Sequence, residues 1–192
     1  TTAKVRPFVQ RYMYKRFVMG TNDSPNKYIK TVMNDNLNVD LKDNDGGFNC
    51  GKPAGFIQDF KALDQSTQDL IKQIKRVRVI PVNASGDSVE LGVTPFIWEV
   101  ENRDAFKILG NCFVKLSKMK RLPPQHNIEV ATEQRKLPNG NSFYIPSVSL
   151  NLTNVIKLSE EDQQTFADFM QWIDNYNDYI INAWNENSRK KE

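Results

Sequence analysis

Aromatic rings alternate with basic side chains near the start of this sequence, and this pattern has the clearest chemical meaning in the chain. Residues 8–18 have strong β-strand character, with Tyr12, Tyr14 and Arg16 on one side and Arg11 and Lys15 on the other. Rings stack on nucleobases while cations follow phosphates, so the pattern is typical of a surface for single-stranded nucleic acid. An edge strand whose rings pack on a core explains the same pattern.

The residues that most enzymes depend on are scarce. The chain has two cysteines, Cys50 and Cys112, and one histidine, His126, which together cannot supply four zinc ligands. It contains no Walker loop, nucleophile elbow, His-Glu-x-x-His or dinucleotide fingerprint. We therefore expect a binding module rather than an enzyme, with no cofactor or metal and with reduced cysteines.

Charge is unevenly distributed along the 192 residues, although the net formal charge is only +3. Residues 1–37 hold seven basic and two acidic side chains, a net of +5, whereas residues 151–192 hold four basic and eight acidic ones, a net of −4. This asymmetry indicates an anionic partner for one end, or an N-terminal arm that neutralises an acidic helix. No apolar run is long enough to span a membrane and the start has no signal-peptide pattern, so we expect no membrane association.

Apolar residues with a period of two mark strands between residues 76 and 150, and a helical pattern interrupts them. The expected elements are a strand marked by Val77, Val79 and Val82, a turn at 85–87, strands over 89–93 and 96–100, a helix over 103–118, and strands over 128–134 and 142–150. This is the order of a five-stranded OB barrel with a helix between its third and fourth strands. The same order also fits an open α+β sheet.

The regions on either side complete the expected fold, which is mainly β with helices. A helix over 159–187 is predicted by a capping box at Ser159 and Asp162 and by a long apolar stripe that includes Phe166, Phe169 and Ile173. We expect residues 1–192 to form a single domain, with 1–62 as a basic and aromatic extension and 76–150 as the barrel. The long helix packs along the barrel or mediates a homodimer.

Four stretches resemble proteins encoded by tailed phages, particularly marine ones: 51–57 (GKPAGFI), 74–80 (IKRVRVI), 96–100 (FIWEV) and 136–144 (KLPNGNSFY). The strand order resembles that of the OB-fold single-stranded-DNA-binding proteins of phages. This resemblance implies a role in phage DNA replication or recombination in the host cytoplasm. Such proteins recruit replication proteins through an acidic tail, but this chain ends in Arg189, two lysines and Glu192.

The sequence therefore predicts sequence-tolerant binding of single-stranded DNA, with RNA as a second candidate ligand. Arg76 and Arg78 are expected to point away from the valines of the first barrel strand, and Trp98 either joins the binding face or packs in the core. The expected binding residues are Arg11, Tyr12, Tyr14, Lys15, Arg16, Arg76, Arg78, Trp98, Arg135, Lys136, Phe143 and Tyr144. The competing hypothesis is a virion structural or assembly protein that binds no nucleic acid.

Overall fold

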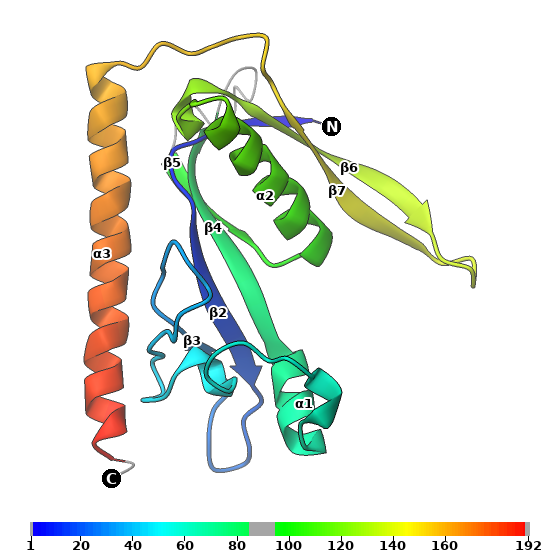
Figure 1. Ribbon diagram of the computed structural model, residues 1–192, viewed down its shortest axis with the longest axis vertical. Helices are drawn as coiled ribbons and strands as arrows, with labels where there is room; N and C mark the ends of the chain where they lie inside the picture. Colours follow the sequence, from blue (N-terminus) through cyan, green and yellow to red (C-terminus); the bar gives the residue numbers. More distant parts are fainter. Residues whose placement is uncertain (1, 85–94, 191–192) are drawn as a thin grey trace. The chain divides into compact units, whose positions relative to one another are not determined.

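The computed structural model of the chain describes residues 2–84 and 95–190 and is an α+β fold (Figure 1). Its strands are β1 (Ala3–Pro7), β2 (Arg11–Val18), β3 (Lys27–Lys30), β4 (Ile74–Ala84), β5 (Pro95–Val100), β6 (Ile128–Lys136) and β7 (Ser142–Leu150). Its α-helices are α1 (Gln65–Gln73), α2 (Arg103–Lys118) and α3 (Glu160–Ser188), and short 3-10 turns cover Asn49–Gly51, Phe60–Ala62 and Pro123–Gln125. The predicted helix over 103–118 and the predicted strand over 142–150 are confirmed residue for residue.

The strands of the described residues form an open sheet in the order β3-β2-β4-β1-β6-β7, with β5 paired to β4. The closed five-stranded barrel expected over 76–150 is therefore not what these residues form. The physical reason is β1, which pairs antiparallel with both β4 and β6 and so separates the first predicted barrel strand from the fourth. The turn expected at 85–87 and the strand expected over 89–93 lie outside the described residues.

The stretch 8–18 forms one strand, β2, as predicted, but β2 does not lie at a sheet edge, and a further strand, β1, precedes it. After β1 the chain enters β2, which lies between β3 and β4 in the sheet order. An interior strand is covered on both faces more easily than an edge strand, and Met13 and Tyr14, which point to opposite faces of β2, are both buried. The prediction that this segment is a sheet edge was wrong.

The chain divides into two compact units, which we call the first unit (residues 1–10 and 79–169) and the second unit (residues 11–78 and 170–192). Two elements contribute residues to both units. Strand β4 belongs to the second unit up to Arg78 and to the first unit from Val79, and helix α3 changes unit after Phe169. That the whole chain forms a single domain stays a prediction.

The core of the first unit lies between its strands and helix α2. Asn102 caps this helix by accepting hydrogen bonds from the backbone N–H groups of Asp104 and Ala105, both at 3.0 Å. The apolar face of α2 then packs against the sheet. The buried residues of this core are Val5, Ile80, Val82, Val100, Ala105, Leu109, Phe113 and Ile128.

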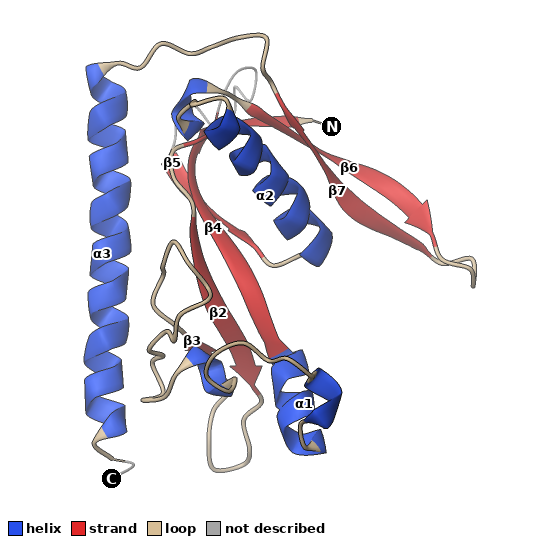
Figure 2. Ribbon diagram, in the orientation of Figure 1, coloured by secondary structure: helices blue, strands red, loops and turns tan. Residues whose placement is uncertain are grey.

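The second unit has its own core, beneath β2 and β3. Its buried cluster contains Tyr14, Ile29, Leu41 and Cys50. Helix α1 begins after Asp64, which caps it by accepting from Thr67 N–H at 2.9 Å. The helix passes directly into β4 at Ile74, without an intervening loop (Figure 2).

Helix α3 begins with the predicted reciprocal cap. Ser159 N–H donates to Asp162 Oδ2 at 2.9 Å, and Asp162 N–H donates to Ser159 Oγ at 3.2 Å. The predicted apolar stripe is buried at Phe169, Ile173 and Ile180, whereas Phe166 is 43% exposed, contrary to expectation. In the described residues no helix combines the length and the apolar character that crossing a bilayer requires.

An ion pair holds the start of α3 to β1 in the first unit. The Arg6 guanidinium donates to both carboxylate oxygens of Asp162, at 2.7 and 2.9 Å, and its Nε donates to the carbonyl of Pro124 at 2.6 Å. Hydrogen bonding from Arg6 lowers the pKa of the Asp162 carboxyl, against a smaller opposing effect of burial.

The two cysteines are buried and form no disulfide, and one lies in each unit. Cys50 belongs to the core beneath β2 and β3, where burial, with a further contribution from Asp43, raises the pKa of its thiol to about 12. Cys112 lies on the buried face of α2, as the sequence indicated.

Candidate nucleic-acid interface

The tyrosines of β2 that the sequence singled out are engaged within the second unit. Tyr14 is 6% exposed, its hydroxyl donates to the carbonyl of Leu37 at 3.3 Å, and burial raises its pKa. The Tyr12 hydroxyl accepts a hydrogen bond from Arg78 Nη1 at 3.0 Å, and the Arg78 guanidinium carbon lies 4.9 Å from the centre of the Tyr12 ring. The Tyr14 ring is buried, and the Arg78 guanidinium lies over the Tyr12 ring.

Arg78 does not point away from the core, as expected, but is buried with only 4% of its surface exposed. The cause is the covering of both faces of β4, which is buried at every position from Val77 to Val82. A cation in such a strand needs local partners, and Tyr12 supplies a hydroxyl and a ring. Arg76, two residues earlier, is exposed as predicted.

The remaining predicted cations of β2 lie on different faces. Arg11 donates to the sulfur of Met170 on α3 at 3.8 Å. Arg16 lies on the face of Ile29, its cross-strand partner, which belongs to the buried cluster. Lys15 points to the opposite face.

That opposite face carries four side chains in a compact group, which we call the platform: Lys15, Phe17, Tyr28 and Lys30. The register pairs Lys15 with Lys30 and Phe17 with Tyr28, so all four share one side of the β2–β3 ladder. The two rings lie 5.1 Å apart between centroids, and the Lys15 and Lys30 ammonium groups lie 5.0 and 5.8 Å from the centre of the Tyr28 ring. Phe17 is 41% exposed and Tyr28 is 51% exposed.

The chemistry of the platform favours an anion with flat, apolar parts. Two lysines directly opposite each other repel, and the Tyr28 ring offsets this only in part through cation–π attraction. A phosphate near both ammonium groups would relieve the repulsion. The exposed rings beside them have the size and geometry to stack on nucleobases.

A cavity of about 360 Å³ adjoins the platform within the second unit and shares the Tyr28 side chain with it. Lys27 and Lys190 add two further cations to its lining, although Lys27 is paired with Asp45 at 2.6 Å. Asn44 and Asn187 contribute amides that also fix the loop backbone to α3, since Asn187 Nδ2 donates to the Asn44 carbonyl at 2.9 Å.

Polar side chains of α3 hold the loops around the platform in place. Tyr176 donates to the carbonyl of Thr31 at 3.0 Å, and Trp184 Nε1 donates to the carbonyl of Gly47 at 2.9 Å. The Asn177 amide forms two bonds with the backbone of Met33, at 2.7 and 3.0 Å. The helix therefore orders the second unit through backbone hydrogen bonds as well as through apolar packing.

Sequence reasoning found Lys15 but missed Phe17, Tyr28 and Lys30. The signal was available, since all three lie in the basic and aromatic first 33 residues. What was missing was β3, a four-residue strand that is too short and too polar to stand out by periodicity. Without that strand, the cross-strand pairs that gather the rings and lysines could not be recognised.

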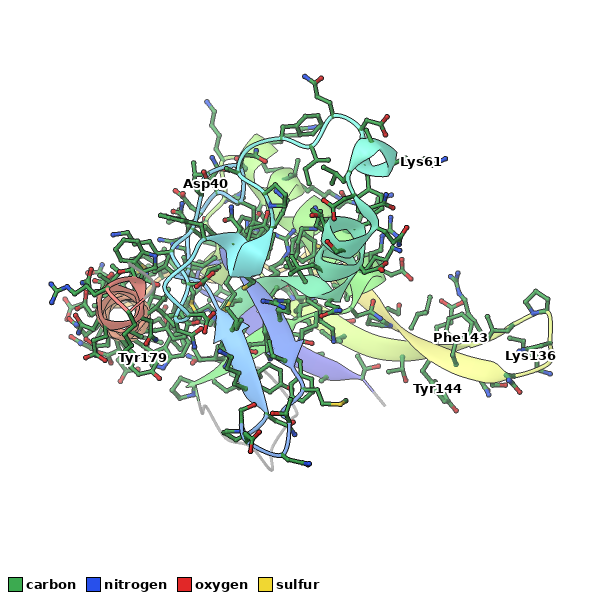
Figure 3. All side chains as sticks on the ribbon, turned by 90° about the horizontal axis from the view of Figure 1, so that it is seen from below. Asp40, Lys61, Lys136, Phe143, Tyr144 and Tyr179 are labelled. Atoms are coloured by element: carbon green, nitrogen blue, oxygen red, sulfur yellow. The ribbon has the colours of Figure 1, made fainter. Side chains whose placement is uncertain are left out.

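The other predicted binding residues lie in the first unit, and four of them are on the hairpin formed by β6 and β7. Its far half, beyond the pair Glu133–Ile145, is exposed on both faces, and we call this part (residues 134–144) the arm. The register pairs Arg135 with Phe143 and Gln134 with Tyr144. Phe143 and Tyr144 therefore point to opposite sides of the ribbon (Figure 3).

Trp98, the remaining predicted residue, is half-buried and packs against the core cluster of the first unit. Of the two positions that the sequence allowed for Trp98, the binding face and the core, the structure has the one in the core. The predicted binding residues are thus divided between the two units. Each side of the arm carries one exposed ring and one cation, whereas the platform places two exposed rings and two lysines on one face.

Among the described residues, no group of three or more His, Cys, Asp or Glu side chains is gathered so as to hold a metal ion. No model of a known protein family matches the chain, and comparisons with curated proteins and with solved structures find no match either.

Proposed function

We propose that this protein binds single-stranded DNA with little sequence preference, through the platform of Lys15, Phe17, Tyr28 and Lys30. The observation that carries the proposal is the placement of two half-exposed rings beside two lysines on one face of a β-ladder. Bases stack on the rings in any sequence, because every base has a π-face, while the lysines neutralise the backbone.

The buried side of the same two strands supports this role. Ile29 and Tyr14 anchor the ladder to the core of the second unit, so the rings on the outer side are held before a ligand arrives. Preorganised rings lose little conformational freedom on binding, and more of the stacking energy is then available for affinity. The cavity beside Tyr28 offers space for a neighbouring nucleotide.

The biological setting is part of the proposal. A phage protein of this kind would protect or present single strands in the host cytoplasm during DNA replication or recombination, together with replication proteins. Helix α2 lies between β5 and β6, at the place where an OB fold has its helix. The proposal does not depend on a closed barrel, because the platform lies on β2 and β3.

Fluorescence anisotropy with labelled single-stranded DNA, RNA and duplex DNA at several salt concentrations tests the function. We expect the single strand to bind most tightly and affinity to fall steeply with salt. The double variant Phe17→Ala with Tyr28→Ala should lose the stacking of one or two bases, at about 5- to 150-fold in affinity for each base. Its salt dependence should stay close to that of the parent, since no cation is removed.

Phe56→Ala is the matched control, because Phe56 is 89% exposed in a loop of the same unit and belongs to no cluster of rings. It should bind like the parent. If the double variant also binds like the parent, the platform is not the interface. If the parent binds none of the nucleic acids, the virion-assembly hypothesis replaces the proposed function, and tighter binding of RNA would change the ligand class.

A further inference from the structure

Two helices of this protein carry opposite charges. From 103 to 121, helix α2 and the turn after it hold six basic side chains and one acidic one, a net of +5. Helix α3 holds seven acidic side chains and no basic one between Glu160 and Ser188, a net of −7. The net charge of the whole chain is close to zero, but basic side chains are concentrated on α2 and acidic side chains on α3.

The exposed side of α2 combines its cations with aliphatic residues. Lys115 and Lys118 are exposed, and so are Val114 at 54%, Met119 at 43% and Leu122 at 57%. We call these five residues the basic face. The opposite side of the helix is occupied by the core of the first unit, so the basic face is the side that a partner could cover.

The exposed side of α3 within the second unit has the complementary composition. Asp174 and Asp178 are exposed one turn apart, and Trp172, Tyr179 and Ile181 are 37%, 64% and 36% exposed. These five residues form the acidic face. Helical geometry places Asp174, Asp178 and Tyr179 away from Ile173 and Ile180, which are buried on the other side, with Trp172 and Ile181 at the two margins of the acidic face. Tyr179 is labelled on α3 in Figure 3.

Nucleic acid suits neither face. Carboxylates repel a phosphate backbone, which excludes the acidic face. The basic face has cations, but its exposed apolar side chains are aliphatic, and they offer no ring on which a base could stack. Aliphatic groups that alternate with lysines are better covered by a protein surface with carboxylates and apolar rings, and the acidic face has that composition.

We propose that the basic face of one copy of this protein binds the acidic face of a second copy, so that chains associate head to tail. The two faces are different surfaces, and a contact between different surfaces leaves one of each unused at the ends. Such a contact is repeated from copy to copy, so assemblies grow larger as the protein concentration rises. The proposal is independent of the platform and needs no nucleic acid.

Sedimentation velocity of the protein alone, over a range of concentrations at about 0.05 M and about 0.5 M salt, tests the proposal. We expect the average size of the parent to grow with concentration at low salt and to decrease at high salt, where the charges are screened. The variant Lys115→Glu/Lys118→Glu and the variant Asp174→Lys/Asp178→Lys should each remain monomeric. In each variant both faces carry charge of the same sign, so copies of the same variant repel one another.

Mixing the two variants in equal amounts provides the decisive measurement. The reversed charges leave a normal acidic face on one variant and a normal basic face on the other, and the two reversed faces also complement each other. The mixture should therefore recover association, which a misfolded variant could not provide. Lys61→Glu/Lys157→Glu is the charge-matched control, since both lysines are exposed outside the two faces, and it should associate like the parent.

Three outcomes would overturn the proposal. The parent could stay monomeric at low salt, the single-face variants could associate like the parent, or the mixture could remain monomeric. Loss of single-stranded DNA binding in Lys115→Glu/Lys118→Glu, with a monomeric parent, would assign the basic face to nucleic acid instead. Failure of the platform variants to change DNA binding would leave the self-association result unaffected.

Discussion

The β2–β3 ladder and the β6–β7 hairpin carry similar residues but differ in what lies behind them. Both are antiparallel pairs with aromatic rings and cations. The first is backed by a buried cluster and presents its rings together, whereas the arm is exposed on both faces and its two rings point apart. A basic and aromatic composition therefore gathers its rings on one side only where strand register and a core place them there.

The largest effect is expected from a substitution in the buried cluster that lies beneath the platform. Ile29→Ala deletes a side chain that is 3% exposed beneath the ladder, and the resulting cavity should lower the free energy of unfolding by about 2–5 kcal/mol. Urea unfolding followed by circular dichroism measures it. Tyr144→Ala on the arm, where the ring is 65% exposed, should change stability by less than about 0.5 kcal/mol. Equal losses of stability in Ile29→Ala and Tyr144→Ala would contradict the difference in packing between the ladder and the arm.

A second test compares single rings in DNA binding. Tyr28→Ala should cost about 1–3 kcal/mol of affinity for single-stranded DNA, because the ring lies between both lysines and beside Phe17. Tyr144→Ala should cost less, since no second ring shares its face at the tip of the arm. Anisotropy titrations at one salt concentration decide between them. A larger loss for Tyr144→Ala would move the interface to the arm.

The third test concerns the unit that carries the arm. The folded-state pKa of Asp162 is lowered, so its ion pair with Arg6 stabilises the protein fully above the unfolded value of 3.8, and this contribution is lost as the pH falls through the lowered pKa. Asp162→Asn should cost about 1–2 kcal/mol at pH 7 and flatten the acid side of the stability profile. Asp168→Asn, exposed on the same helix and in the same unit, is the control. If stability depended on pH in the same way in the parent and in Asp162→Asn, the ion pair with Arg6 would not be the source of this pH dependence.

The smallest expected effect is on salt dependence. Lys30→Ala should reduce the slope of log affinity against log salt by about 0.7, the value for one phosphate on a single strand. Lys136→Ala on the arm should leave the slope closer to that of the parent. Titrations at four or more salt concentrations give both slopes. A larger change for Lys136→Ala would show that the arm, and not the platform, follows the backbone.

Local signals predicted the helices well. Asn102 and Asp64 cap α2 and α1, and Ser159 with Asp162 caps α3, because each cap involves groups a few residues apart. The Asn-Gly turn and alternating residues likewise gave the β6–β7 hairpin, where Gly140 has a φ of 86°.

The failures were all non-local. The burial of Arg78 depends on Tyr12, 66 residues away, and the open sheet depends on the insertion of β1 between β4 and β6. The candidate site follows the same rule. Lys15 was found as part of an obvious strand, but its partner Lys30 lies on a strand whose existence is decided by packing on Leu41 and Cys50.

The two buried cysteine thiols give each unit its own reporter of local opening. The Cys50 thiol, with its pKa raised to about 12, has almost no thiolate at neutral pH, and Cys112 is buried on α2, so a thiol reagent reaches either one only when its unit opens. Because β4 and α3 run through both units, equal labelling rates at the two positions would mean that the units open together. Unequal rates would measure how far one unit can unfold while the other stays closed, without any engineered label.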